Sequence, residues 1–314
     1  RFVGSLLRMP AYVKFFLLLI LVVGLAWSAL YPSIASSPCT GDCRLSDVRR
    51  RQGVAVNLSC IPPGMRLAKA LGDLKMAVLG ENDIISQSLF KNHHWEVTSL
   101  EEMAAMARTT LPESGTFLHI GANLGYYSLL FADRGFQVLA IEPMARNQQA
   151  LEGSLCLNPH LREQVTLLPL ALGAPWEVAC RCVIRSASYS SNVGNGFLQC
   201  GNASCKDDDS NCQVTEVISL DRVLEQHPVQ SVDVVRIDVE AHECQVLAGG
   251  GSLFSRYRPK FLQVETAWLN TSKCVAAAAE QHRYRTFRVM SSTVMVAEEF
   301  VVPELVKLGE NMWV

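Results

Sequence analysis

Acidic side chains follow three apolar stretches of this sequence, at positions where they could bind or activate a hydroxyl group. Glu142 follows the first stretch, Asp238 and Glu240 follow the second, and Glu265 follows the third. A carboxylate accepts hydrogen bonds from hydroxyl groups, such as the two of a ribose, and it can also take the proton of a reacting hydroxyl. Alternatively, an acid at a strand end has no role beyond capping the next helix. We interpret Asp221 in this way. Asp238 and Glu240 are one strand period apart and point to the same side, which favours a functional role for both.

The stretch 116–147 predicts the elements that place the first of these acids. It opens with a short apolar run that predicts a buried strand, and the run ends at the turn Gly121-Ala-Asn-Leu-Gly125. The pattern that follows predicts a helix, and the apolar run 138–141 predicts a second strand, which ends at Glu142. A strand, a glycine turn, a helix and a strand ending in an acid form one βαβ unit of a nucleotide-binding sheet.

The glycine turn lacks the features that bind phosphate. Gly121 and Gly125 let the backbone turn tightly and approach a ligand closely. The third glycine of the dinucleotide fingerprint is absent, as is the Lys-Ser/Thr pair of a phosphate loop. This pattern argues against a pyrophosphate or triphosphate and favours a nucleoside without phosphate, for which S-adenosylmethionine is the main candidate. The alternative is an ordinary strand-to-helix turn that binds nothing.

The rest of the chain predicts an open, mostly parallel α/β sheet, whose ligand crevice lies at the carboxyl ends of the strands. The expected strands are 165–172, 214–220, 232–240, one within 260–268, and a closing hairpin of 285–290 with 293–300, and the expected helices are 145–157 and 242–257. Residues 64–113 predict a helical preamble or lid, with helix-like segments at 65–80 and 99–111. The adjacent His93 and His94 point apart, so we expect no metal site there.

Length and composition set the class of protein. The chain has 314 residues, of which 49% are hydrophobic, which is enough for one α/β domain with accessory segments. The net charge is −2 and no basic stripe is present, so nothing points to nucleic acid.

The 11 cysteines indicate the compartment. Five of them crowd one segment, at positions 180, 182, 200, 205 and 212, and we assign residues 176–213 to a cysteine-rich insertion. In a cytosolic protein this group could hold zinc, but paired C-x2-C knuckles are absent. In a luminal or secreted protein it would be stapled by disulfides, which is the interpretation we favour.

The N-terminal region predicts a membrane anchor. We assign residues 1–14 to a cytosolic N-terminus, the apolar run 15–30 to a signal anchor or transmembrane helix, and residues 31–63 to a luminal stem. Three glycosylation sequons, at Asn57, Asn202 and Asn270, follow the run. These features predict a single-pass protein of the Golgi or ER membrane with a luminal body. The alternative is secretion after cleavage of a signal peptide near Ala35.

Several motifs of the chain resemble one known family, the FkbM-type class I methyltransferases. The matching pieces are Ile120-Gly-Ala-Asn-Leu-Gly-Tyr-Tyr-Ser128, Ala140-Ile-Glu-Pro143, Ala171-Leu-Gly173, Ser219-Leu-Asp221, Arg236-Ile-Asp-Val-Glu240 and the lead-in Trp95-Glu96. The resemblance covers about residues 90–290. It implies a Rossmann-like, mostly parallel seven-stranded sheet with helices on both faces, S-adenosylmethionine as methyl donor and a hydroxyl acceptor, such as a glycan or a small hydroxylated compound. On this basis we assign residues 114–300 to a methyltransferase domain and 301–314 to a C-terminal tail.

The resemblance also implies roles for individual residues. The cofactor-binding residues would be His119, Gly121, Asn123, Gly125, Glu142, Ala171 and Asp238, and the catalytic residues would be Asp238, Glu240 and His242. The chain departs from the family at two positions. His119 stands where an acid usually anchors the methionine ammonium group, and Ala241 stands where a glycine usually follows the Asp-x-Glu motif.

We therefore expect an S-adenosylmethionine-dependent O-methyltransferase of the secretory pathway. Proton transfer from the acceptor hydroxyl would fall to Asp238 or Glu240, with His242 as a further candidate base. A second hypothesis is an inactive luminal binding protein that keeps the methyltransferase fold, and His119 is its main support. A nucleotide-dependent oxidoreductase does not fit the glycine pattern.

Overall fold

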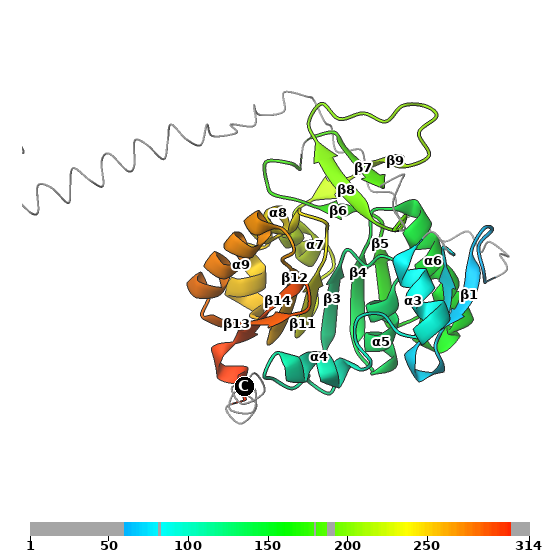
Figure 1. The fold of residues 1–314 in the computed structure, drawn as a ribbon. Coiled ribbons are helices and arrows are strands. Elements are labelled where there is room, and N and C mark those ends of the chain that lie inside the picture. The colour runs from blue at the N-terminus through cyan, green and yellow to red at the C-terminus, as the bar shows by residue number, and fades with distance from the viewer. Residues whose placement is uncertain (1–59, 81–82, 179, 187–191, 303–314) are drawn as a thin grey trace, which may run out of the picture. The chain divides into compact units, whose positions relative to one another are not determined.

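A seven-stranded sheet forms the centre of the fold in the computed structural model, which describes residues 60–80, 83–178, 180–186 and 192–302 (Figure 1). The strand order is β13-β14-β12-β11-β3-β4-β5. Five strands run parallel, namely β3 (Thr116–Ile120), β4 (Gln137–Ile141), β5 (Val165–Leu168), β11 (Val234–Ile237) and β12 (Phe261–Glu265). β14 (Ser292–Ala297) pairs antiparallel with β12 and with β13 (Tyr284–Val289). The predicted mostly parallel sheet and its closing hairpin are confirmed.

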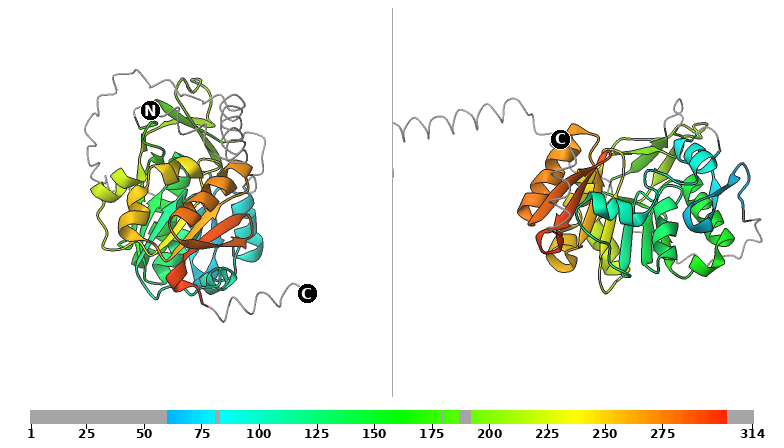
Figure 2. Two further views of the ribbon diagram at one scale, coloured as in Figure 1. Left: turned by 90° about the vertical axis from the view of Figure 1, so that its left-hand side faces the viewer. Right: turned by 60° about the horizontal axis from the view of Figure 1, so that its bottom comes forward.

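Helices cover both faces of this sheet, and alternate strand residues face opposite layers (Figure 1, Figure 2). Phe117, Val138 and Val234 belong to one buried cluster, which they form with residues of α3 (Ile84–Asn92), α4 (Leu100–Met106), α5 (Tyr126–Asp133) and α6 (Ala145–Leu157). Their neighbours Leu118, Leu139 and Val235 belong to the other, with α7 (Leu220–Gln226), α8 (Glu243–Ala248) and α9 (Leu269–Gln281). Strands buried on both faces explain why the sequence shows continuous apolar runs. The short helical turns are η1 (Leu71–Asp73), η2 (Pro159–Leu161), η3 (Leu253–Tyr257) and η4 (Glu298–Phe300).

The segment 65–80, which we expected to be helical, is a β-hairpin of β1 (Arg66–Lys69) and β2 (Lys75–Val78). The preamble is thus only partly helical. The turn explains the difference, because Gly72 and Asp73 both have left-handed φ angles, of 68° and 65°. The hairpin also docks on α6, since the backbone N–H of Ala77 donates to Ser154 Oγ at 3.0 Å. The disulfide Cys60–Cys156 joins the same two regions.

The cysteine-rich insertion forms a small antiparallel sheet, with β7 (Cys182–Ser186) between β8 (Gly196–Cys200) and β9 (Cys212–Thr215). At its base β6 (Ala171–Leu172) pairs in parallel with β10 (Val217–Ile218), so the two long strands expected at 165–172 and 214–220 are each interrupted. The pairs Cys182–Cys200 and Cys205–Cys212 confirm the expected disulfides of the insertion. A further pair, Cys244–Cys274, joins α8 to α9.

One expectation about Asp221 is wrong in detail. Ser219 is the N-cap of α7, where its side chain accepts from the N–H of Arg222, and Asp221 lies in the first turn. The Asp221 carboxylate instead accepts from the N–H of Ser252 at 2.8 Å and ties α7 to the segment after α8.

Within residues 60–80, 83–178, 180–186 and 192–302, no helix is both long enough and apolar enough to cross a membrane. The expected membrane helix at 15–30 lies outside these ranges, as do most of the stem with Asn57 and most of the C-terminal tail.

Candidate functional site

A pocket lies at the carboxyl ends of the central parallel strands, beside the insertion. Its lining includes the glycine turn, the ends of β4 and β11, the start of α3 and the loop 192–196. Eight predicted site residues line it, namely His119, Gly121, Asn123, Glu142, Ala171, Asp238, Glu240 and His242. Gly125 does not. Its left-handed φ of 87° starts α5, and a Cβ atom there would come within 2.4 Å of Leu151 Cδ1, so its role is to let α5 pack on α6.

Gly121 holds the two central strand ends close together. Its φ is 79°, and a Cβ atom at this position would lie 1.9 Å from the carbonyl oxygen of Asp238. The N–H groups of Gly121 and Ala122 both donate to the carbonyl of Ile141 at 2.9 Å. A glycine is therefore required, and the space beside it forms a narrow cradle between β3, β4 and β11.

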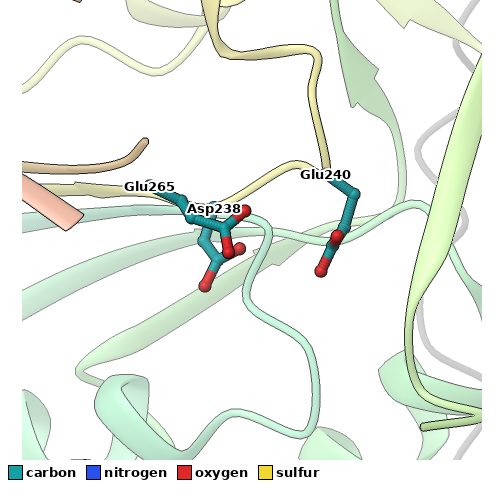
Figure 3. Close-up of side chains that lie close together, drawn as sticks. All are labelled: Asp238, Glu240 and Glu265. Carbon is teal, nitrogen blue, oxygen red and sulfur yellow. The ribbon is translucent and has the colours of Figure 1, made fainter. Parts of the chain in front are cut away.

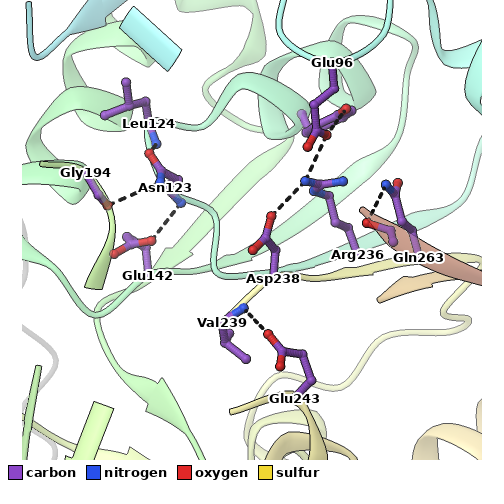
Figure 4. Close-up of polar contacts among 12 residues, drawn as sticks. Glu96, Asn123, Leu124, Glu142, Gly194, Arg236, Asp238, Val239, Glu243 and Gln263 are labelled. Atoms are coloured by element: carbon purple, nitrogen blue, oxygen red, sulfur yellow. Dashed lines mark hydrogen bonds and ion pairs between the residues drawn. The ribbon is translucent and has the colours of Figure 1, made fainter. Parts of the chain in front are cut away.

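Glu142 is buried at the end of β4, with 4% of its surface exposed. Its Oε2 accepts from the N–H of Asn123 at 2.7 Å (Figure 4). Its Oε1 accepts from the N–H of Met144 at 2.8 Å, and Asn147 Nδ2 lies 3.3 Å from Oε1. Burial raises the pKa of Glu142 to about 7, although these hydrogen bonds favour the ionised form. Each carboxylate oxygen can accept a second hydrogen bond, so the group can also take hydroxyl donors.

The insertion closes one side of the pocket through Gly194. Its carbonyl accepts from Asn123 Nδ2 at 3.2 Å and from Asn147 Nδ2 at 2.8 Å, and its N–H donates to Asp83 Oδ1 at 3.3 Å. Asp83 is the N-cap of α3, so the preamble, the glycine turn and the insertion meet at one point. Sequence reasoning did not find this junction, because its members are far apart in the chain and none belongs to a motif.

Three carboxyl groups gather at the ends of β11 and β12 (Figure 3). Asp238, Glu240 and Glu265 each place a carboxylate oxygen within 4.8 Å of the others, and the side chain of Glu265 is hydrogen-bonded to that of Asp238. Burial raises the pKa of all three, and repulsion adds to it, from Glu96 for Asp238 and from Asp238 for the other two acids. The pKa is raised to about 9 for Glu265 and to about 7 for Glu240. A proton shared between Glu265 and Asp238 explains how two of them can lie together. The spacing could also hold a metal ion, which the sequence did not predict.

The geometry at β3, β4 and β11 agrees with a family match. Residues 119–287, more than half of the chain, match the family model described as the methyltransferase FkbM domain. The chain belongs to the FkbM methyltransferase family. Its cofactor is S-adenosylmethionine. The pocket fits this cofactor, because the cradle at Gly121 admits a close ligand and Glu142 can accept ribose hydroxyls.

Several solved structures are similar to the chain at low sequence identity. One is the precorrin-6y C5,15-methyltransferase from Geobacter metallireducens GS-15, at 11% identity and a TM-score of 0.37, with 64% of this chain and 88% of that chain covered. Another is the Aeropyrum pernix fibrillarin in complex with natively bound S-adenosyl-L-methionine, at 10% identity and a TM-score of 0.33, with 76% and 86% covered. The METTL16 MTase domain is similar at 11% identity and a TM-score of 0.35, with 62% of each chain covered. No curated protein matches the chain.

The two departures from the family pattern have local explanations. His119 is buried, and its Nδ1 lies 2.8 Å from Ser128 Oγ. Burial and the nearby Arg236 hold the pKa of His119 well below its usual range, so the ring is neutral. Ala241 has a left-handed φ of 72°, and Glu240 before it has one of 53°. This turn explains why a glycine is usual at position 241.

Arg236 is a buried cation beside the carboxyl cluster that sequence reasoning quoted only as part of a motif. It is 5% exposed, and its Nη2 lies 2.9 Å from Asp238 Oδ2 and 3.0 Å from Glu96 Oε2. Its guanidinium stacks over the Tyr127 ring, with 4.4 Å between the guanidinium carbon and the ring centroid. These contacts fix the position of the Asp238 carboxylate.

His242 precedes α8 and is 9% exposed. Its Nε2 lies 3.1 Å from Glu177 Oε2, which also accepts from the N–H of Ala174 at 2.8 Å. Burial would raise the pKa of Glu177, but the bonds from His242 and Ala174 outweigh it and lower that pKa. Glu177 therefore stays ionised and orients the imidazole.

Proposed function

We propose that this FkbM methyltransferase transfers the methyl group to a hydroxyl of a glycan or of another compound of the secretory pathway. The observation that carries the proposal is the cluster of Asp238, Glu240 and Glu265 in the pocket wall, because a hydroxyl acceptor must lose a proton. Glu240, with a pKa of about 7, is ionised in a large fraction of molecules at neutral pH and can take that proton.

The binding roles follow from the pocket lining. Gly121 and Asn123 would border the ribose and methionine parts of the cofactor, Glu142 would accept the ribose hydroxyls, and Ala171 would line the pocket on the side of the insertion. When bound, S-adenosylmethionine supplies an electrophilic methyl group. Asp238, which Arg236 holds in place, would orient the acceptor hydroxyl at the end of β11.

In this proposal Glu240 would accept the hydroxyl proton as the acceptor oxygen takes the methyl group, whose bond to sulfur breaks so that S-adenosylhomocysteine leaves. The carboxylate of Glu240 can turn toward an acceptor, because its hydrogen bond is to the side chain of Asn195 and not to the backbone. His242 is a second candidate base, since its Nε2 lies 3.1 Å from Glu177 Oε2, which orients the ring. The histidine lies one residue beyond Ala241 and lines the pocket.

We also propose a luminal location, with residues 15–30 as the membrane anchor, and secretion after cleavage as the alternative. Four disulfides join described cysteines, which supports an oxidising compartment. Asn202 and Asn270, the two described sequon asparagines, are exposed, as glycosylation requires. The net charge of −2 supports an acceptor other than nucleic acid.

The direct test is methyl transfer by the purified full chain from labelled S-adenosylmethionine to an array of glycans and small hydroxyl compounds. We expect label on a hydroxyl oxygen, and we expect Glu240→Gln to bind the donor but transfer at least 100-fold more slowly. Glu216→Gln, in the segment between β9 and β10 outside the pocket lining, is the control. Donor binding without transfer to any acceptor would favour the second hypothesis, a luminal binding protein. A chain that binds no donor would refute both.

A further inference from the structure

Glu96, in the lead-in to the sheet, lines the same pocket but has no role in the scheme above. Its side chain is 16% exposed, and its Oε2 accepts from the Tyr127 hydroxyl at 2.8 Å and pairs with Arg236 Nη2 at 3.0 Å. Its Oε1 has no hydrogen-bond partner within the part of the chain that the structure describes. One oxygen is therefore held in place, and the other is left for a ligand.

The backbone at Glu96 is held in an uncommon conformation. Its φ is 58°, in the left-handed region that residues other than glycine rarely adopt, and the N–H of Val97 donates to the carbonyl of Trp95 at 2.7 Å. Such conformations persist where surrounding contacts over-determine them, and they gather at functional sites. Here the contacts to Tyr127 and Arg236 fix the carboxylate against the pocket wall.

The charges at this end of the pocket do not balance. Among the described residues, Arg236 is the one cation paired with Glu96 and Asp238, so these three groups carry one net negative charge when both acids are ionised. Glu265 is neutral at pH 7 because its pKa is raised to about 9, and His119 is neutral as well. A buried charge is stable only when it is paired. A ligand with a cationic group would therefore be stabilised at the end of the pocket beside Glu96.

S-adenosylmethionine has such a group in the α-ammonium of its methionine part. Glu142, the proposed ribose contact, and the Glu96–Arg236 pair lie on opposite sides of Asp238 (Figure 4), so the nucleoside and amino-acid parts can occupy different ends. Asp238 and Glu265 are hydrogen-bonded to each other, and Asp238 also pairs with Arg236. Glu265 Oε2 also has no hydrogen-bond partner among the described residues, but Glu265 is neutral at pH 7. Glu96 is therefore the ionised carboxylate beside Arg236 that keeps an unpaired oxygen.

We propose that Glu96, through Oε1, binds the α-ammonium group of S-adenosylmethionine in place of the acid that is missing at His119. Arg236 and Tyr127 act as positioning residues that hold the other oxygen of Glu96. The inference rests on the proposed donor binding in this pocket, and it explains how the site can work with a neutral side chain at position 119.

The test compares two ligands that differ only in the ammonium group. Calorimetry measures the affinity of the purified full chain for S-adenosylhomocysteine and for its des-amino analogue, in which hydrogen replaces the ammonium. The unaltered chain should prefer S-adenosylhomocysteine by about 10- to 100-fold, the range for one charge-assisted hydrogen bond. Glu96→Gln should lose most of this preference while it binds the des-amino analogue as before. Glu113→Gln, which removes an exposed acid at the end of the preamble 64–113, should change neither affinity.

The outcomes distinguish a ligand-binding role of Glu96 from a structural one. A preference that survives Glu96→Gln, or an equal loss for both ligands, would overturn the assignment and leave Glu96 a structural partner of Arg236. An unaltered chain that binds neither ligand would refute the proposed function together with this inference. Tyr127→Phe provides a milder second variant, which keeps the carboxylate and removes one of its hydrogen bonds. It should reduce the preference by a smaller factor, and no reduction would count against the assignment.

Discussion

Glu142→Gln should change the pH dependence of stability as well as donor binding. The pKa of Glu142 in the folded chain is about 7, above the ordinary value of 4.5, so the folded state holds a proton that the unfolded state releases between those values. The contribution of Glu142 to the free energy of unfolding therefore falls as pH rises from about 4.5 and levels off above about 7. At about 1.36 kcal/mol per pH unit, the full loss is on the order of 3 kcal/mol, and about 2.5 kcal/mol of it falls between pH 5 and pH 8.

Glutamine cannot ionise, so the variant lacks this loss. It places an NH2 group against the N–H of either Asn123 or Met144, which costs about 1–3 kcal/mol at every pH. The variant should thus be less stable than the unaltered chain at pH 5, and the difference should vanish or reverse at pH 8. Chemical denaturation at a series of pH values measures this difference, in which the titration of all other groups cancels.

Glu152→Gln is the matched control, because Glu152 is a half-exposed acid on α6 that pairs with Arg162. Its difference from the unaltered chain should stay within about 0.5 kcal/mol across the series. Affinity for S-adenosylhomocysteine gives a second readout, since ribose hydroxyls favour the ionised Glu142 and binding should strengthen as pH rises to 7. A Glu142→Gln difference that does not vary with pH would refute the raised pKa and the reasoning built on it.

The remaining predictions concern the turn and the base. Glu240→Gln should abolish the rise in the methyl-transfer rate between pH 6 and pH 8, because only the ionised carboxylate accepts a proton and its pKa is about 7. Single-turnover rates measured across this pH range test the prediction. Ala241→Gly should stabilise the fold by about 1 kcal/mol, since φ is 72° there, and a lower denaturation midpoint would contradict it. Gly121→Ala should abolish binding of S-adenosylhomocysteine in calorimetry, because the added Cβ meets the Asp238 carbonyl at 1.9 Å.

The parallel sheet could be predicted from the sequence because its strands are buried on both faces. The run 117–120 lies within β3 (Thr116–Ile120), and the run 138–141 lies within β4 (Gln137–Ile141). Continuous apolar runs separated by a glycine turn and a helix leave few other arrangements. The site acids could be found for the same reason, since they follow these runs directly.

The hairpin at 66–78 could not be predicted, because tertiary contacts outweigh its local pattern. Its residues include Leu, Ala, Lys and Met, which favour helices in isolation. The side chains of Ser154 on α6 and of Asn158 at its C-cap bond to the backbone of β2 and replace the bonds that a helix would make. Nothing in the segment itself reveals that partner.

The contact partners of the site residues could not be predicted from the sequence either. Glu96 and Arg236 form an ion pair across 140 positions of the chain, and Asp83 reaches Gly194 across 111. Such pairs arise only after the sheet has brought the lead-in and the insertion to the same edge. The signal for Glu96 was its place in the lead-in motif, which gave no hint of what the carboxylate contacts.

Glu142 and Glu240 show how environment separates the roles of two similar acids. Both have a pKa raised to about 7, mainly by burial. Glu142 accepts from two backbone N–H groups and is 4% exposed, so its carboxylate is fixed and suits a ligand that must be held. Glu240 lies in a left-handed turn and bonds to the side chain of Asn195, so its carboxylate can turn to an acceptor and release the proton afterwards. A raised pKa is thus compatible with binding in one case and with proton transfer in the other, and the hydrogen-bond partners decide between them.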